Sequence, residues 1–123
     1  MSNIRVILCV DDESTGLTVR RLLLSTQGYT VLTASSGACA LKQFSLNNVD
    51  LVVTEYLLPD LTGVELVSEM KRLKPQVPVI LLTGLVEPPS GFEEADLLLT
   101  KAMTPPEFLA EIAKLLANTP AAC

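Results

Sequence analysis

Acidic, hydroxyl and cationic side chains follow several short apolar runs in this sequence, and their types suit the binding of metal ions or phosphoryl groups. Asp11 and Asp12 come directly after one apolar run, Glu55 ends another, and Thr83 and Lys101 end two more. Carboxylate oxygens suit hard divalent cations such as Mg²⁺. A hydroxyl and an ammonium suit a phosphoryl or carboxylate oxygen. Whether these five side chains can act together depends on the elements that carry them.

Short apolar or β-branched runs predict strands, and the amphipathic segments between them predict helices. The predicted strands are Arg5–Val10, Tyr29–Ala34, Leu51–Thr54, Val77–Thr83 and Asp96–Lys101. Helices are predicted over Ser14–Gln27, over Ala38–Phe44 after a serine cap, after the Thr62–Glu65 capping box, and from the Thr104–Glu107 capping box to near Asn118. Val19, Leu22 and Leu23 have the spacing of an apolar face on the first of these helices.

The interval between the fourth and fifth predicted strands leaves almost no room for a helix. Gly84–Gly91 contains two prolines and two glycines, and only Phe92–Ala95 remain before the next strand. We therefore predict that helix four is shortened or missing and that Gly84–Gly91 is a mobile loop. An exposed apolar edge near Leu97 and Leu99 is the predicted contact surface for a partner or a second copy.

Alternating strands and helices predict an α/β fold, a doubly wound parallel sheet with helices on both faces. The 123 residues suit a single domain, residues 1–123, with a core of about 3–117 and a loose tail over 118–123. In a five-stranded sheet of order 2-1-3-4-5, ligands bind outside the carboxyl ends of strands one and three. The five side chains named above are therefore expected to converge at that edge.

Composition excludes several classes of function. The net charge is −5 and the 9 Lys and Arg are scattered, so direct binding of nucleic acid is not expected. Apolar runs such as Val77–Leu82 are far shorter than the ~20 residues of a membrane span, which predicts a soluble, cytoplasmic protein. The absence of histidine excludes Ser-His-Asp chemistry and His-ligated zinc. Cys9, Cys39 and Cys123 form no CxxC pair and are predicted to be reduced.

The predicted cluster has more negative than positive charge. Asp11, Asp12 and Glu55 beside one Lys101 leave it near −2, and two like charges ~4 Å apart repel by about 4 kcal/mol at an effective dielectric of 20. This balance suits Mg²⁺ or another hard divalent cation, and weak binding is predicted because Glu55 over-reaches the ideal coordination distance. In a competing arrangement Glu55 pairs with Lys101 and no metal is bound. Each residue alone has a simpler structural role, such as capping of the first helix by Asp11 or Asp12.

Four motifs carry a resemblance to a known family. VDDE, a carboxylate followed by LLPDLTG, LLTG and LLLTKA resemble the receiver domain of two-component response regulators, over about residues 3–117. In that flavodoxin-like fold, an aspartate at the end of strand three takes a phosphoryl group from a histidine kinase. The resemblance implies roles for five further positions: Asp11 and Asp12 as the acid pair that holds Mg²⁺, Thr83 as the hydroxyl, Lys101 as the lysine, and the main-chain carbonyl of Leu57 as a metal ligand.

The sequence departs from the family at the acceptor position, because Glu55 stands where the family has aspartate. The extra methylene carries the carboxylate ~1.5 Å further out, a misplacement that can slow a positioned reaction about a hundredfold. Glu55 is instead expected to mimic the phosphorylated state in part, with one charge against the roughly −2 of a phosphoryl group. Leu98 replaces the switch Tyr or Phe, and Lys101-Ala102 replaces the usual Lys-Pro.

The leading prediction is an atypical receiver, a signalling module rather than an enzyme, that acts by contact with a sensor histidine kinase or another signalling protein and can form a homodimer. One alternative is a receiver that still accepts a phosphoryl group on Glu55, inefficiently and with Mg²⁺. A second is a flavodoxin-like nucleotide or flavin binder, disfavoured because Asp11-Asp12-Glu13 would repel phosphate where a glycine-rich loop is needed. A third is a metal-dependent phosphohydrolase with an aspartate nucleophile.

Overall fold

Strands and helices alternate along the chain, as predicted. The structure is a computed structural model, and it describes residues 4–119. The strands are β1 (Val6–Val10), β2 (Thr30–Ala34), β3 (Leu51–Glu55), β4 (Val79–Thr83) and β5 (Leu97–Thr100). The helical elements are α1 (Ser14–Ser25), α2 (Gly37–Leu46), α3 (Gly63–Leu73), the 3₁₀ turn η1 (Phe92–Glu94) and α4 (Pro105–Ala117).

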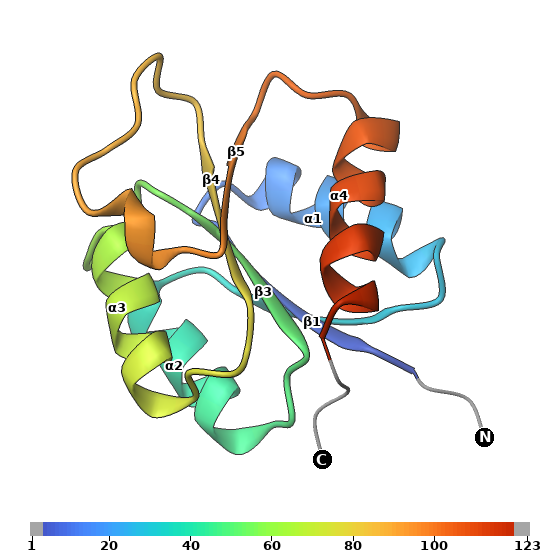
Figure 1. Ribbon diagram of the computed structural model, residues 1–123, viewed down its shortest axis with the longest axis horizontal. Coiled ribbons are helices and arrows are strands. Elements are labelled where there is room, and N and C mark those ends of the chain that lie inside the picture. Colours follow the sequence, from blue (N-terminus) through green and yellow to red (C-terminus); the bar gives the residue numbers. More distant parts are fainter. Residues whose placement is uncertain (1–3, 120–123) are drawn as a thin grey trace.

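The five strands form one parallel sheet of order β2-β1-β3-β4-β5, which confirms the predicted doubly wound fold. Figure 1 shows α2 and α3 on one face of this sheet and α1 and α4 on the other. The register pairs Val10 with Thr54, Glu55 with Leu82, and Thr83 with Thr100. The carboxyl ends of β1, β3, β4 and β5 are therefore level, and the residues that end or follow these strands lie along one edge.

Side chains that alternate along the strands build a core on each face of the sheet. One core joins β1 and β3 to α2 and α3, and its large members include Leu8, Phe44, Leu66 and Met70. The other joins them to α1 and α4, and includes Ile7, Leu24, Phe108 and Ile112. Cys9 belongs to this second core, and its burial raises the pKa of its thiol to about 12. The described cysteines, Cys9 and Cys39, are both unpaired, whereas Cys123 lies outside the described residues.

Side-chain caps fix where the helices begin. Thr62 and Thr104 each accept a hydrogen bond from the backbone N–H three residues on, and the glutamate at that position bonds back, so both predicted capping boxes are confirmed. Ser36 caps α2 with a single bond, which its hydroxyl accepts from the backbone N–H of Cys39. The cap of α1 is Glu13, whose carboxylate accepts from two backbone N–H groups. Neither Asp11 nor Asp12 is that cap.

The predicted apolar face of α1 is wrong, although the helix itself is present. Val19 and Leu22 are 56% and 53% exposed, whereas Leu24 is fully buried and Leu17 is partly buried against the core. Leu23 is only partly buried. Three leucines in succession let the periodicity fit more than one face of the helix, so spacing alone did not identify the buried one.

Helix four is reduced to η1, as predicted, and residues 84–91 contain no helix or strand. The predicted exposed apolar edge near Leu97 and Leu99 is wrong, because these two residues are not the exposed ones. Leu99 is 8% exposed and, with the partly buried Leu97, packs into the core beneath α4. Leu98 points to the other face, where it lines a shallow hollow with Leu85 and Val86. A parallel strand alternates its side chains, so only one of three consecutive leucines could serve the face that helix four would cover.

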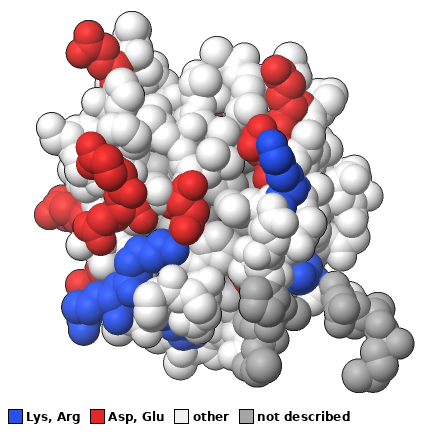
Figure 2. Space-filling view, viewed as in Figure 1, with Lys and Arg blue, Asp and Glu red and all other residues white. Residues whose placement is uncertain are grey.

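Charge on the surface is unevenly spread. Figure 2 shows acidic side chains gathered over α3 and η1, with Lys and Arg in small separate groups. No helix among residues 4–119 is long and apolar enough to cross a membrane.

At the C-terminal end, Arg5 donates hydrogen bonds to the carbonyls of Leu116 and Thr119, so the first residues of the predicted loose tail are held in place. The rest of that tail, residues 120–123, lies outside the described residues.

Candidate functional site

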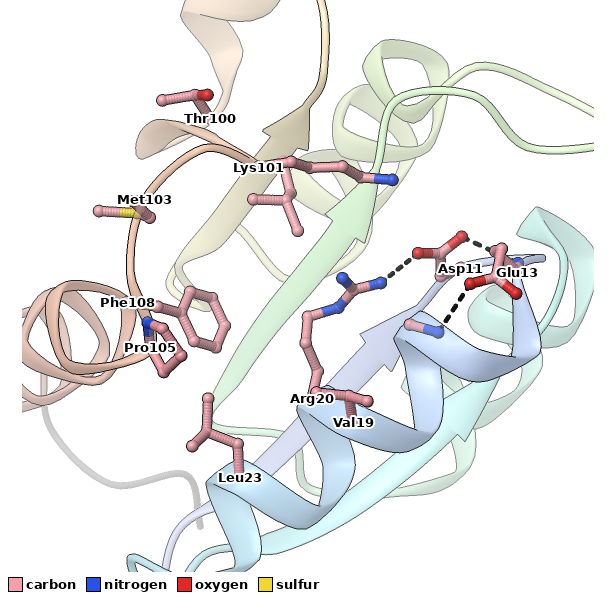
Figure 3. A pocket seen from close by; sticks show the side chains of 12 residues that line it. Asp11, Glu13, Val19, Arg20, Leu23, Thr100, Lys101, Met103, Pro105 and Phe108 are labelled. Atoms are coloured by element: carbon pink, nitrogen blue, oxygen red, sulfur yellow. Dashed lines mark hydrogen bonds and ion pairs between the residues drawn. The ribbon is translucent and has the colours of Figure 1, made fainter.

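Residues at the carboxyl ends of three strands and one side chain of α1 meet at the predicted edge of the sheet. Asp11 follows β1, Glu55 ends β3 and Lys101 follows β5. Arg20 comes from α1, and Figure 3 shows it reaching up to Asp11 while Lys101 extends toward the end of β3 from the other side. The site therefore contains two acids and two cations that face one another.

Glu55 and Lys101 form an ion pair. The Lys101 Nζ lies 3.1 Å from Glu55 Oε2, and the two side chains are 40% and 8% exposed. Burial raises the pKa of Glu55, and the nearby Lys101 ammonium offsets this effect only in part. The negative charge of Asp11 raises the pKa of Glu55 further. The lysine is thus already bound to a carboxylate of its own chain.

Asp11 is held on both oxygens. Its Oδ1 accepts a hydrogen bond from the backbone N–H of Glu13 at 3.0 Å, and its Oδ2 pairs with an Nη atom of Arg20. The Asp11 side chain is 2% exposed and that of Arg20 is 16% exposed. This is a nearly buried ion pair, in which the charges are screened far less by solvent than at the surface.

The other predicted site residues are placed differently. Asp12 is exposed. The Thr83 hydroxyl is buried and accepts a hydrogen bond from the N–H of Leu85 at 3.0 Å. Leu57 forms an isolated bridge with Thr62 in the turn after β3. The predicted convergence therefore holds for Asp11, Glu55 and Lys101, whereas Asp12 and Thr83 lie at its margin.

A hollow of about 320 Å³ opens beside these ion pairs, between α1 and α4. Its walls include Leu23 and Val19 from α1, and Met103 and Phe108 from the start of α4 and the segment before it. Arg20 and Lys101 line the same hollow. Both cations are engaged by acids, so the apolar wall is the part left open.

Sequence reasoning missed Arg20, Gly16 and Glu13. One signal for Arg20 was present: it lies at i+3 from Leu17, and Leu24 follows at i+7, so a charged residue sits in the middle of one helical line that faces the sheet. Gly16 precedes Arg20 by one turn, where a residue without a side chain leaves room for a long one. Glutamate is not among the preferred N-cap residues, so the sequence gives no signal for the capping role of Glu13.

The residues in this arrangement do not fit a divalent metal ion. No group of three or more Asp, Glu, Cys or His side chains in the described part of the chain is placed to hold one. Asp11 is engaged by Arg20 and Glu55 by Lys101. A metal ion would have to displace at least one of these cations.

A doubly wound parallel sheet of order β2-β1-β3-β4-β5, with acids at the ends of β1 and β3 and a lysine after β5, has the architecture of a flavodoxin-like signalling domain. The model of the response regulator receiver domain family matches residues 7–113. The chain belongs to the response regulator receiver domain family, whose members are signalling modules of two-component systems.

Curated relatives include the alkaline phosphatase synthesis transcriptional regulatory protein PhoP of Bacillus subtilis, 36% identical over 89% of this chain and 48% of its own length. The probable transcriptional regulator ycf27 of Cyanophora paradoxa is 37% identical over 95% of this chain and 50% of its length. The chain spans half or less of the length of the curated relatives it matches.

Solved structures agree on the fold. A putative response regulator from Chloroflexus aurantiacus is similar with a TM-score of 0.87 and 30% identity, covering 94% of this chain and 99% of that one. The response regulator TrrA of Thermotoga maritima, solved in complex with Mg(2+)-BeF, has a TM-score of 0.86 and 31% identity, covering 91% and 99%.

Proposed function

We propose that this chain is an atypical receiver in which Glu55 occupies the phosphoacceptor position and holds the domain in one constant signalling state. The observation that carries the proposal is the ion pair between Glu55 and Lys101 at 3.1 Å. In the family this lysine is the cation that meets the phosphoryl group. Here a built-in carboxylate already meets it, which is the contact a phosphoryl group would otherwise supply. The mimicry is partial, because one carboxylate carries less charge than a phosphoryl group.

Reduced acceptance of a phosphoryl group follows from the same contact. A phosphoryl group delivered to Glu55 would have to break the ion pair and lie ~1.5 Å further from the backbone than on an aspartate, and a misplacement of this size can slow a positioned reaction about a hundredfold. Burial also raises the pKa of Glu55, which disfavours the charged form that acts as the nucleophile.

The parts that relay phosphorylation in the family are altered as well. Leu98 stands at the switch position, and a leucine has no ring to rotate between two environments. Helix four is replaced by the single 3₁₀ turn η1. A modification can shift a conformational equilibrium only by its different affinity for the two states. These features support a signal that is constant rather than switched.

The expected partners are a sensor histidine kinase or another signalling protein, bound by surface contact in the cytoplasm, with a second copy of the chain as a further candidate. PhoP of Bacillus subtilis and ycf27 of Cyanophora paradoxa, both named as transcriptional regulators, are about twice as long as this chain. Direct binding of nucleic acid is not part of the proposal, because the chain carries a net charge of −5.

The direct test is incubation of the wild-type chain and the Glu55→Asp variant with acetyl phosphate and Mg²⁺, followed by intact mass measurement. The wild-type mass should stay unchanged, and the variant should gain one phosphoryl unit, because the shorter arm returns the carboxylate to the acceptor distance. Glu93→Asp, on the exposed η1 turn, is the matched control and should gain nothing.

A wild-type chain that gains a phosphoryl unit on Glu55 as fast as the Glu55→Asp variant would refute the proposal and favour a receiver that works by ordinary phosphorylation. If neither chain is labelled, even when Arg20→Met is added to both so that Mg²⁺ need not displace a guanidinium from Asp11, position 55 is not what blocks acceptance and the proposed role of Glu55 fails.

A further inference from the structure

Asp11 of this site is already neutralised by a side chain of the chain itself. The Arg20 guanidinium pairs with Asp11 Oδ2, and the two side chains are only 16% and 2% exposed. An arginine this well buried beside a carboxylate is a committed partner, because breaking such a pair leaves an uncompensated buried charge. Figure 3 shows the guanidinium lying at the end of β1, where the predicted cation would be held.

Gly16 makes room for this arrangement. A Cβ atom at position 16 would lie 3.6 Å from both terminal nitrogens of Arg20 and 3.4 Å from Glu13 Oε1. These are ordinary contact distances, so a methyl group would just fit. Any larger side chain would have to occupy space that the guanidinium or the Glu13 carboxylate now fills. Glycine and arginine at i and i+4 therefore act as a matched pair on α1.

The charges of the site balance once Arg20 is counted. Asp11 and Glu55 contribute two negative charges, and Arg20 and Lys101 contribute two positive ones, in two ion pairs. The carboxylate of Glu13 is used at the helix cap, where it accepts from Thr15 and Gly16. The exposed Asp12 is then the acid left to attract a divalent cation, and a single exposed carboxylate binds such an ion poorly.

We infer that Arg20 is the resident cation of this site and takes the place of a divalent metal ion beside Asp11. The acidic edge of the sheet is thereby kept neutral and ordered without metal. A divalent cation binds tightly only when the guanidinium is removed. This inference goes beyond the role proposed for Glu55, because it concerns a different residue and a different ligand.

The test is calorimetric titration of the 123-residue chain with MnCl₂, without any phosphodonor. The Arg20→Met variant should bind Mn²⁺ at least about tenfold more tightly than the wild-type chain, because the metal no longer competes with a guanidinium. Gly16→Val, which crowds the guanidinium out, should change affinity in the same direction. Arg21→Met is the matched control and should bind as the wild type does, since Arg21 makes no ion pair with the described residues.

Equal Mn²⁺ affinity in the wild type and in Arg20→Met would overturn the inference, as would tight binding by the wild type. A second measurement uses the wild-type chain alone, so it does not depend on whether a variant folds. In the ¹⁵N spectrum of the wild-type chain, the Arg20 side-chain N–H signal should exchange slowly and keep its position in millimolar MgCl₂. A shift of that signal to the position of a solvent-exposed arginine would show that metal displaces Arg20 readily. Because no phosphoryl transfer is measured, either failure leaves the role of Glu55 untouched.

Discussion

At the scale of single residues, the site is a pair of ion pairs rather than a set of free acids. Glu55 is bound to Lys101 and Asp11 to Arg20, and both acids are nearly buried. Removing charges from water is costly, so pairs of this kind fix an arrangement more than they add stability. Their effect is to keep the edge of the sheet in one geometry.

A change of Glu55 to glutamine should stabilise the fold at neutral pH. Because the pKa of Glu55 is raised in the folded chain, its contribution to stability is present below the unfolded pKa and is lost as pH rises through the folded pKa. Urea unfolding should therefore show Glu55→Gln gaining on the wild type as pH rises above about 4.3, the ordinary pKa of a glutamate. Glu93→Gln, at an exposed carboxylate, is the control. A variant that is less stable than the wild type at pH 7 would mean that the ion pair outweighs the cost of burial.

Three of the predicted site residues could be found from the sequence, whereas the one signal for Arg20, its line with Leu17 and Leu24, is ambiguous. Asp11, Glu55 and Lys101 end or directly follow apolar runs, and parallel strands bring their carboxyl ends to one edge. Arg20 lies inside a helix, so its direction depends on which face of α1 packs on the sheet. The succession of leucines in α1 left that face ambiguous.

At the scale of elements, the start of α3 is what holds the end of β3 in place. Gly63 donates a hydrogen bond to the carbonyl of Tyr56 at 2.6 Å. A Cβ atom there would lie 2.5 Å from the carbonyl oxygen of Glu55 and 2.8 Å from Tyr56 Cα. Only glycine permits so close an approach, and the backbone that carries Glu55 is one wall of the contact.

Gly63→Ala should therefore destabilise the fold by about 1–3 kcal/mol, the usual cost of overpacking a site that cannot relax. It should also move the backbone of Glu55 and weaken the ion pair with Lys101. Thermal unfolding measures the first effect. The control is Gly84→Ala, where a Cβ would lie 3.8 Å from Lys101 Cδ and meet no backbone. If both variants melted at the same temperature, the close packing of α3 on β3 would not be what requires glycine at position 63.

Element order, the sheet and the caps could be predicted because each has a local signal. The capping boxes of Thr62 and Thr104 mark where their helices begin, and the prolines after Gly84 exclude a long helix four. The direction of Leu97 and Leu99 could not be read in the same way. A run of three leucines is apolar on both faces, so only the position of β4 and α4 decides which members are buried.

At the scale of the whole molecule, the edge of the sheet is more rigidly held at the ends of β1 and β3 than in the segment that follows β4. The β1 and β3 end is fixed by ion pairs and by the close packing of α3, whereas few amides in the segment after β4 are hydrogen-bonded. Within residues 84–91, which are all described, the hydrogen-bonded amide is that of Leu85, and Val86 is fully exposed.

Hydrogen exchange should separate these regions. Amides of residues 84–91 should exchange rapidly, because few are hydrogen-bonded, while those of β3 and β4 should be strongly protected. The Gly84→Ala variant is the control: it changes one residue at the start of the loop, and the amides of residues 84–91 should still exchange rapidly. Slow exchange over residues 84–95, together with helical chemical shifts, would mean that an ordered helix forms there and that the account of helix four is wrong.

A constant signalling state is tested most directly by ¹H–¹⁵N spectra of the wild-type chain, recorded with and without beryllofluoride and Mg²⁺. The signals of β4, β5 and α4 should all stay unchanged, because Glu55 already engages Lys101. The Glu55→Asp variant should change only close to residue 55, because its switch position is still Leu98 and helix four is still the short η1 turn. Shifts in the wild-type chain that spread from Glu55 to Leu98 and α4 would show a working switch and contradict a constant signalling state.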